Sequence, residues 1–167
     1  MVAIKPDVLV IGAGSGGLSV AAGAAQMGAH VVLLEGHKMG GDCLNYGCVP
    51  SKALLAAGKV QMGYSAAKDY VQTAVATIAP HDSVERFEKL GVRVIKEFGS
   101  FISPTEVKAG DNIIRARRVV IATGSGPLIP KIPGLTDVPF YTNENIFDLR
   151  EKPKHLLIIG GGPIGME

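Results

Sequence analysis

Two cysteines are the residues of this chain best suited to covalent chemistry. Cys43 and Cys48 are the only cysteines among 167 residues, and they flank four residues in the stretch GGDCLNYGC. A pair at this spacing can ligate a metal ion, pack as two inert thiols, or close a small redox-active loop. Zinc would need two further ligands, and the sequence has no CxxC or HxxxH cluster to supply them. The redox alternative needs a lowered thiol pKa and an electron acceptor beside one sulfur.

The residues after the second cysteine could supply the lowered thiol pKa. A helix predicted to begin near Pro50–Ser51 would direct the positive end of its dipole at Cys48. Lys52, one turn further on, adds a cation, and Gly47 provides a flexible joint between the thiols. An electron acceptor has to come from elsewhere in the fold.

A glycine-rich turn near the start of the chain predicts a dinucleotide site. Gly12, Gly14 and Gly17 form a GxGxxG pattern between an apolar strand and a helix of small residues. Such glycines permit a tight turn, a close approach to a pyrophosphate and close packing of helix on strand. Glu35 follows Gly14 by 21 residues, at the end of the next apolar run, where a ribose hydroxyl needs an acceptor. The pattern alone does not separate FAD from NAD.

The remaining pattern predicts an α/β fold, a doubly wound parallel sheet with a β-meander crossover. Residues 51–79 read as helical with a break near Gly63, and residues 81–91 as an amphipathic helix. VRVIKEFGSFIS, TEVKAG and NIIRARRVVIAT are short alternating runs typical of a meander. NENIFDL reads as one helical turn. HLLIIGGGPIG repeats the opening DVLVIGAGSGG and predicts a second strand and glycine turn.

Composition excludes several classes of protein. The net charge of +2 and the lack of a basic block argue against nucleic acid as a partner. Residues 8–34 contain no Asp, Glu, Lys or Arg, which could indicate a signal peptide or membrane span. Six glycines interrupt this run, and a strand–helix–strand unit in a covered parallel sheet has the same hydropathy. We therefore expect a cytoplasmic protein with no membrane partner.

Taken together, the motifs closely resemble those of the flavoprotein pyridine nucleotide–disulfide oxidoreductases, the family of dihydrolipoamide dehydrogenase, glutathione reductase and mercuric reductase. The resemblance covers the whole chain. It rests on the first GxGxxG with its acid, on GGDCLNYGCVPSKALL, on VVIATGS, on the IPG connection and on GGGPIGME, in that order.

The resemblance implies a role for each motif residue. Cys43 would attack the disulfide or bind the metal-ion substrate, and Cys48 would face the flavin. Lys52 would stand beside the flavin, paired with Glu167. The implied FAD contacts are Gly12, Gly14, Ser15, Gly16, Gly17, Glu35, Gly36, Gly41, Asp42, Lys52, Gly99, Ala122, Thr123 and Gly124. On this basis the thiols form a reversible disulfide in which Cys43 is the more accessible sulfur, and no resident metal is expected.

The resemblance also implies a domain plan. Residues 1–150 would form the FAD domain, and residues 151–167 would begin an NAD(P)-binding domain that the sequence leaves unfinished. The chain is thus expected to be the N-terminal part of a longer, homodimeric enzyme that uses FAD and NAD(P)H. Two residues depart from the family pattern: Asp42 replaces a common threonine, and Pro163 stands where some members have a gating tyrosine. His30, His37, His81 and His155 match no family site and are expected at the surface or in packing.

Overall fold

The computed structural model describes residues 3–167, which form two compact units. One unit consists of the chain up to Gly41 together with Ile78–Gly124, and we call it the sheet unit. The other consists of Asp42–Thr77 and Ser125–Glu167, and we call it the helical unit. Each unit is built from two segments that are distant in sequence. The division of binding domains near residue 150 stays a prediction, because these units are defined by compactness and not by ligand binding.

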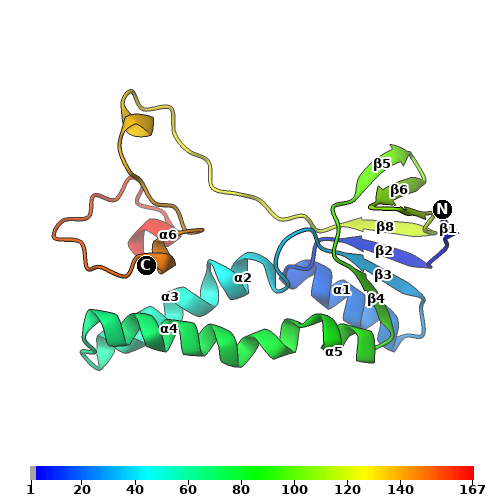
Figure 1. Ribbon diagram of the computed structural model, residues 1–167, viewed down its shortest axis with the longest axis horizontal. Helices are drawn as coiled ribbons and strands as arrows, with labels where there is room; N and C mark the ends of the chain where they lie inside the picture. The colour runs from blue at the N-terminus through cyan, green and yellow to red at the C-terminus, as the bar shows by residue number, and fades with distance from the viewer. Residues whose placement is uncertain (1–2) are drawn as a thin grey trace. The chain divides into compact units, whose positions relative to one another are not determined.

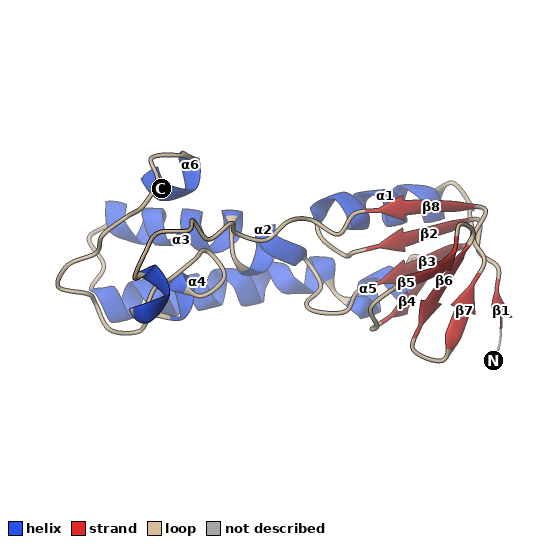
Figure 2. Cartoon of the chain, turned by 90° about the horizontal axis from the view of Figure 1, so that it is seen from above, coloured by secondary structure: helices blue, strands red, loops and turns tan. Residues whose placement is uncertain are grey.

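The sheet unit contains a four-stranded parallel sheet in the order β4-β3-β2-β8 (Figures 1 and 2). Its strands are β2 (Val8–Ile11), β3 (Val31–Leu34), β4 (Val92–Ile95) and β8 (Arg118–Ile121). The central strand β2 pairs in parallel with β3 and with β8, so that Leu9 lies between Val32 and Val119. The predicted α/β class with a Rossmann-like parallel sheet is confirmed.

A second sheet, in the order β1-β7-β6-β5, forms the predicted meander. Its strands are β1 (Ala3–Ile4), β5 (Ser100–Ser103), β6 (Glu106–Ala109) and β7 (Asn112–Ile114). The run from Asn112 to Thr123 is not one meander strand, because it is divided between β7 in this sheet and β8 in the parallel sheet. Strand β4 likewise belongs to the parallel sheet. Alternation of side chains predicts a strand but does not say which sheet it joins.

Successive side chains of β2 point to opposite faces of the parallel sheet, and both faces are buried, which explains why residues 8–34 begin with uncharged residues. Val10 packs in one apolar cluster with Leu18, Ala21 and Phe87, which belong to helices. Leu9 and Ile11, on the opposite face, pack with Val107, Ala109 and Ile114 of the meander. Figure 1 shows α1 (Ser15–Gln26) and α5 (Val84–Lys89) on one side of the parallel sheet and the meander on the other. Both faces of the sheet are covered at its centre, so the central strands β2 and β3 are apolar throughout. Across residues 3–167, no helix combines the length and the apolar character needed to cross a membrane.

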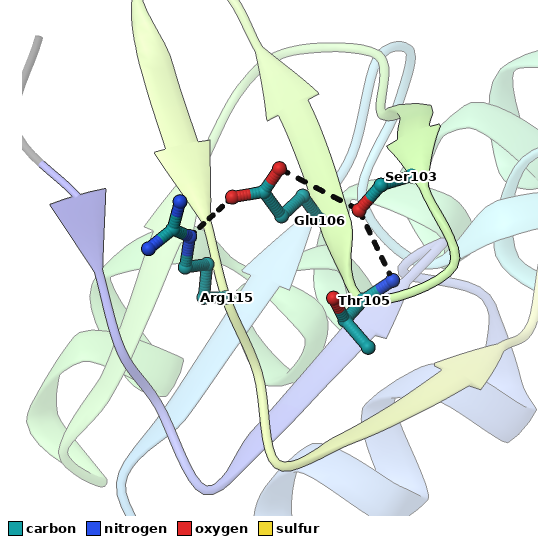
Figure 3. Close-up of polar contacts among 4 residues, drawn as sticks. All are labelled: Ser103, Thr105, Glu106 and Arg115. Atoms are coloured by element: carbon teal, nitrogen blue, oxygen red, sulfur yellow. Dashed lines mark hydrogen bonds and ion pairs between the residues drawn. The ribbon is translucent and has the colours of Figure 1, made fainter.

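A polar cluster fixes the edge of the meander (Figure 3). Glu106 on β6 forms an ion pair with Arg115, directly after β7. The other carboxylate oxygen of Glu106 accepts from Ser103 Oγ at 3.5 Å, and Ser103 Oγ accepts from Thr105 N at 3.3 Å. These contacts tie the β5–β6 turn to β7, and we assign them a structural role.

The helical unit carries the cysteines. It contains α2 (Gly41–Asn45), α3 (Cys48–Lys59), most of α4 (Tyr64–Ile78) and a short α6 (Pro163–Met166). Three 3-10 turns complete the chain: η1 (Ala79–Asp82) in the sheet unit, and η2 (Leu135–Asp137) and η3 (Ile146–Asp148) in the helical unit. The predicted break near Gly63 separates α3 from α4, and the predicted turn in NENIFDL is η3; both predictions are confirmed.

The predicted strand at residues 155–159 does not form. No strand is assigned there in the described part of the chain, and Leu157 is 86% exposed. A strand needs a neighbour to pair its N–H and C=O groups, and neither described sheet extends to this segment. The prediction of a strand here was wrong, because an apolar pattern cannot supply the neighbour that a strand needs.

Candidate functional site

The first glycine turn has the geometry that a tight strand-to-helix turn requires. Gly12 donates its N–H to Leu34 O at 2.8 Å and adopts a φ of +104°, which L side chains rarely tolerate. A Cβ on Gly12 would overlap Ala122 O and lie 3.2 Å from Thr123 Cα. The predicted residues Ala122 and Thr123 therefore run directly beside the turn, and Gly124 follows with a φ of +68°.

The amino end of α1 presents unfilled backbone donors. Gly14 precedes the helix, and within the described chain no side chain caps this end. The first intrahelical bond runs from Leu18 N to Gly14 O at 2.9 Å. The N–H groups of residues 15–17 precede that bond, and no acidic residue occupies the first turn. A Cβ on Gly17 would overlap Gly12 O, so the helix can approach the turn closely only with glycine there. This arrangement suits a phosphate group.

Glu35 holds the turn in shape. One carboxylate oxygen accepts from Ala13 N at 2.7 Å, and the other accepts from His37 N at 2.7 Å. Glu35 N donates to Ile95 O at 3.1 Å, which fixes the end of β3 against β4. The sequence predicted a ribose acceptor at this position but not these two backbone partners. A carboxylate has about four acceptor positions, so a ligand hydroxyl can still bind beside them.

Three more predicted glycines are required by close packing within the sheet unit. A Cβ on Gly41, whose φ is +57°, would lie 2.6 Å from Gly14 Cα. The chain just before the cysteines therefore lies directly against the first glycine turn. A Cβ on Gly36 would meet the Phe98 ring at 2.5 Å, and one on Gly99 would meet Leu34 Cδ1 at 2.8 Å. Gly16, in contrast, has open space around its Cα.

The two thiols lie together in the helical unit. Cys43 is on α2 and Cys48 begins α3, with Gly47 between the helices at φ −132° and ψ −112°. The helix thus begins two residues earlier than predicted, and Cys48 lies in its first turn. Hydrogen bonding with the Cys48 thiol and burial raise the pKa of the Cys43 thiol to about 11. The two thiols therefore interact directly in the reduced chain.

The predicted order of thiol accessibility is wrong for this structure. Cys43 is half-buried, whereas Cys48 is exposed. The loop-side thiol packs into the short helix α2, while the thiol at the start of α3 faces outward. Sequence spacing could not show which of the two would be covered.

We therefore expect iodoacetamide to modify Cys48 before Cys43 in the reduced chain without FAD. A thiol of pKa about 11 is only about 0.1% thiolate at pH 8, and its reaction rate should rise about tenfold per pH unit until near that pKa. Cys48→Ala removes the largest cause of the raised pKa of Cys43 and should accelerate its modification about tenfold at pH 8. Mass mapping at timed intervals measures both rates, and earlier modification of Cys43 would contradict this assignment.

Lys52 and Glu167 form the predicted ion pair. Lys52 Nζ lies 2.8 Å from Glu167 Oε1, with the two side chains 66% and 31% exposed. This contact raises the pKa of Lys52 and lowers that of Glu167. Cys48 and Cys43 add smaller electrostatic contributions that also raise the pKa of Lys52.

The second glycine turn repeats the first in its local geometry. Gly160 has a φ of +115°, as Gly12 has +104°. Gly162 precedes α6 with φ −76° and ψ 177°, close to the φ −79° and ψ −177° of Gly14 before α1. A Cβ on Gly165 would overlap Gly160 O, as one on Gly17 would overlap Gly12 O. The sequence repeat is therefore also a structural repeat, although the strand before the second turn does not form.

Several contacts in the helical unit were not foreseen from sequence. Asn143 Nδ2 donates to Asp42 Oδ1 at 2.9 Å, across 101 residues of chain. Lys68, only 2% exposed, donates to Ile146 O at 3.3 Å, and burial lowers its pKa. Tyr64 Oη donates to Leu149 O at 3.0 Å. In the sequence, Tyr64 and Lys68 are four residues apart and so share one face of α4. This spacing does not identify their partners, the carbonyl oxygens of Leu149 and Ile146.

The histidines and the metal prediction complete the comparison with the sequence. His30, His37, His81 and His155 are all exposed, as expected for surface residues. His37 also contacts the Phe98 ring edge-on, with ring centroids 5.4 Å apart. Among the described residues, no group of three or more His, Cys, Asp or Glu side chains is arranged to hold a metal ion.

Residues 6–167 match the family model described as pyridine nucleotide-disulphide oxidoreductase. The chain belongs to this family. Curated relatives include a chloroplastic dihydrolipoyl dehydrogenase of Arabidopsis thaliana and a mercuric reductase of Bacillus cereus. Each is 34% identical over 96% of this chain, which covers 32% and 28% of their respective lengths. Oxidoreductases of this family use FAD and NAD(P)H.

A solved structure agrees with this assignment. The Cu(II) complex of the HOCl-induced flavoprotein disulfide reductase RclA from Escherichia coli matches 95% of this chain with a TM-score of 0.87 and 29% identity. This chain covers 37% of that protein. The family resemblance read from the motifs is confirmed, and the chain spans about a third of the length of these matched proteins.

Proposed function

We propose that this chain is the N-terminal, FAD-binding part of a flavin-dependent disulfide or mercuric-ion oxidoreductase. In the whole protein, electrons from NAD(P)H would pass by way of FAD to the Cys43–Cys48 disulfide. The observation that carries the proposal is the pair of interacting thiols, with the Lys52–Glu167 ion pair one turn further along α3, in a chain that also has a phosphate-accommodating glycine turn. A cytoplasmic location and a homodimeric parent protein belong to the same proposal.

The residues of the sheet unit fit FAD. The donors at the amino end of α1, with Ser15 and Gly16, would hold the pyrophosphate, and Glu35 would accept from the ribose. Gly12, Gly14 and Gly17 leave the space that a Cβ would fill, and Gly41 packs against Gly14. The further proposed contacts in this unit are Gly36, Gly99, Ala122, Thr123 and Gly124. The family resemblance adds Asp42 and Lys52, which belong to the helical unit. FAD would supply a carrier that accepts two electrons from a nicotinamide and donates them to a disulfide.

The residues of the helical unit fit the thiol chemistry. Lys52, four residues after Cys48 on α3, would favour a thiolate, while Glu167 partly cancels its charge. The reduced pair would transfer its electrons to a small disulfide or to a metal ion, with Cys43 proposed to contact the substrate. The second glycine turn supports the start of an NAD(P)H-binding fold.

Two other functions are testable against this one. The chain could bind FAD without turning over a substrate, or it could act as a dithiol that binds heavy-metal ions. The outward-facing Cys48 beside Cys43 favours soft metal ions for the second alternative. Neither alternative needs electrons to move between a flavin and the thiols.

Electron counting distinguishes these functions. The chain is reconstituted with FAD and titrated anaerobically with dithionite while its visible spectrum is recorded. We expect uptake of four electrons, two by FAD and two by the disulfide, with a long-wavelength thiolate–flavin band at the midpoint. The matched control, Cys48→Ser, should take up two electrons and show no such band. Uptake of two electrons by the wild-type chain would refute the redox pair, and failure to bind FAD would refute the flavin site.

A further inference from the structure

Asp42 directly adjoins the cysteine loop, residues 43–48, and its proposed contact with FAD does not explain its charge. It directly precedes Cys43, and its side chain is exposed. A Cβ added to Gly47 would lie 3.1 Å from Asp42 Oδ2, so the carboxylate rests against the residue that precedes Cys48. The negative charge is therefore placed next to both thiol-bearing residues.

The carboxylate is held in this position by a neutral partner. Asn143 Nδ2 donates to Asp42 Oδ1 at 2.9 Å. Asn143 lies on a closed turn in which Asn145 Oδ1 accepts from Thr142 N at 2.7 Å and Ile146 N donates to Thr142 O at 3.0 Å. An amide orients a carboxylate without cancelling its charge.

Side chains of α4 anchor the segment that contains Asn143. The buried Lys68 donates to Ile146 O at 3.3 Å, and Tyr64 Oη donates to Leu149 O at 3.0 Å. Arg150 adds an ion pair with Asp69 at 2.8 Å. Three side-chain contacts thus fix the segment that presents Asn143, so the contact with Asp42 is part of an ordered arrangement.

The charge of Asp42 is not balanced by an ion pair. Among residues 3–167, the ion pairs of the helical unit are Lys52–Glu167 and Arg150–Asp69. Lys52, one turn after Cys48 on α3, is paired with Glu167. Asp42 therefore keeps a negative charge beside the cysteines that no described ion pair cancels. In agreement, Asp42 contributes to raising the pKa of Cys43, although less than Cys48 and burial do.

We propose that Asp42 is a selectivity residue of the dithiol. It favours disulfides that carry a positive charge or no charge beside their sulfurs, and it disfavours anionic disulfides. This inference rests on the proposed function, because it assumes that the thiols exchange with a disulfide. The selection acts through charge: an anionic group approaching the thiols meets the fixed carboxylate, and a cationic group is attracted by it.

The exchange itself consumes no further reagent. One protein thiolate attacks a sulfur of the small disulfide, which forms a mixed disulfide and releases one thiolate. The second protein thiolate attacks the protein sulfur of that mixed disulfide, which closes the Cys43–Cys48 bond and releases the second thiolate. Two electrons leave the protein dithiol and reduce one disulfide to two thiols.

The test compares three small disulfides that differ in charge. The reduced chain is mixed at low ionic strength with cationic cystamine, neutral hydroxyethyl disulfide or anionic dithiodipropionate, and closure of the protein disulfide is followed by mass spectrometry. A unit charge about 6 Å away in water changes a rate roughly threefold. Asp42→Asn, which keeps the size and an amide contact, should therefore lower the cystamine-to-dithiodipropionate rate ratio by about tenfold. Salt of about 0.5 M should reduce the wild-type ratio in the same direction.

The controls separate charge selection from other effects. The rates with cystamine and dithiodipropionate are each divided by the rate with neutral hydroxyethyl disulfide, so that a change in thiol acidity cancels. Asp111→Asn changes the net charge equally in the turn between β6 and β7 of the sheet unit, and it should leave the ratio unchanged. An unchanged ratio in Asp42→Asn overturns the selectivity role while leaving the redox pair intact. Failure of all three disulfides to oxidise the wild-type pair overturns the proposed function itself.

Discussion

Replacement of Gly17 by alanine is expected to weaken FAD binding strongly and to lower the free energy of unfolding by about 3 kcal/mol. A Cβ at this position overlaps Gly12 O and lies 3.3 Å from Val10 Cγ1, so α1 must move away from the turn. The displacement also moves the backbone donors proposed to hold the pyrophosphate. We expect roughly a hundredfold weaker FAD binding, which corresponds to about 2.8 kcal/mol. Denaturant unfolding without FAD and fluorescence titration with FAD measure the two effects separately.

Gly23→Ala is the matched control in the same helix. No atom lies within 4 Å of a Cβ added to Gly23, which is in the interior of α1. Alanine should raise the free energy of unfolding by about 0.5–1 kcal/mol, because glycine loses more backbone entropy in a helix. FAD affinity should not change. Equal stability of the Gly17→Ala and Gly23→Ala variants would show that the close approach of α1 to the turn is not required.

Glu35→Ala is expected to weaken FAD binding by about 1–3 kcal/mol, or roughly 5- to 150-fold. The carboxylate holds Ala13 N and His37 N, so its removal leaves two backbone donors without their acceptor. The stability of the chain without FAD should therefore fall as well. A ribose contact alone would lower only the FAD affinity, so measurement of both quantities separates the two roles.

Glu35→Gln provides the control for charge. The amide keeps one acceptor oxygen and the length of the side chain, so one of the two backbone contacts can be retained. We expect effects between those of wild type and Glu35→Ala in both measurements. Wild-type FAD affinity in Glu35→Ala would remove Glu35 from the binding site and leave it with the structural role alone.

The sequence by itself determined those features whose cause is local. The glycine turns at Gly12 and Gly160 need positive φ, and the residue types that permit it are visible in the chain. The break before α4, the turn at η3 and the two-sided burial of β2 also follow from neighbouring residues and from periodicity. The Lys52–Glu167 pair spans 115 residues, and it was predicted only because the family resemblance joined its two motifs.

The tertiary structure decided everything that depends on partners distant in sequence. The run from Asn112 to Thr123 divides between two sheets, and residues 155–159 form no strand, because pairing depends on which neighbour is present. The coverage of Cys43 and the exposure of Cys48 follow from the packing of α2 and the start of α3. Asn143 reaches Asp42 only because α4 anchors its turn. Each of these depends on long-range contacts and desolvation, which arise only when separate segments pack together, and neither spacing nor residue type encodes them locally.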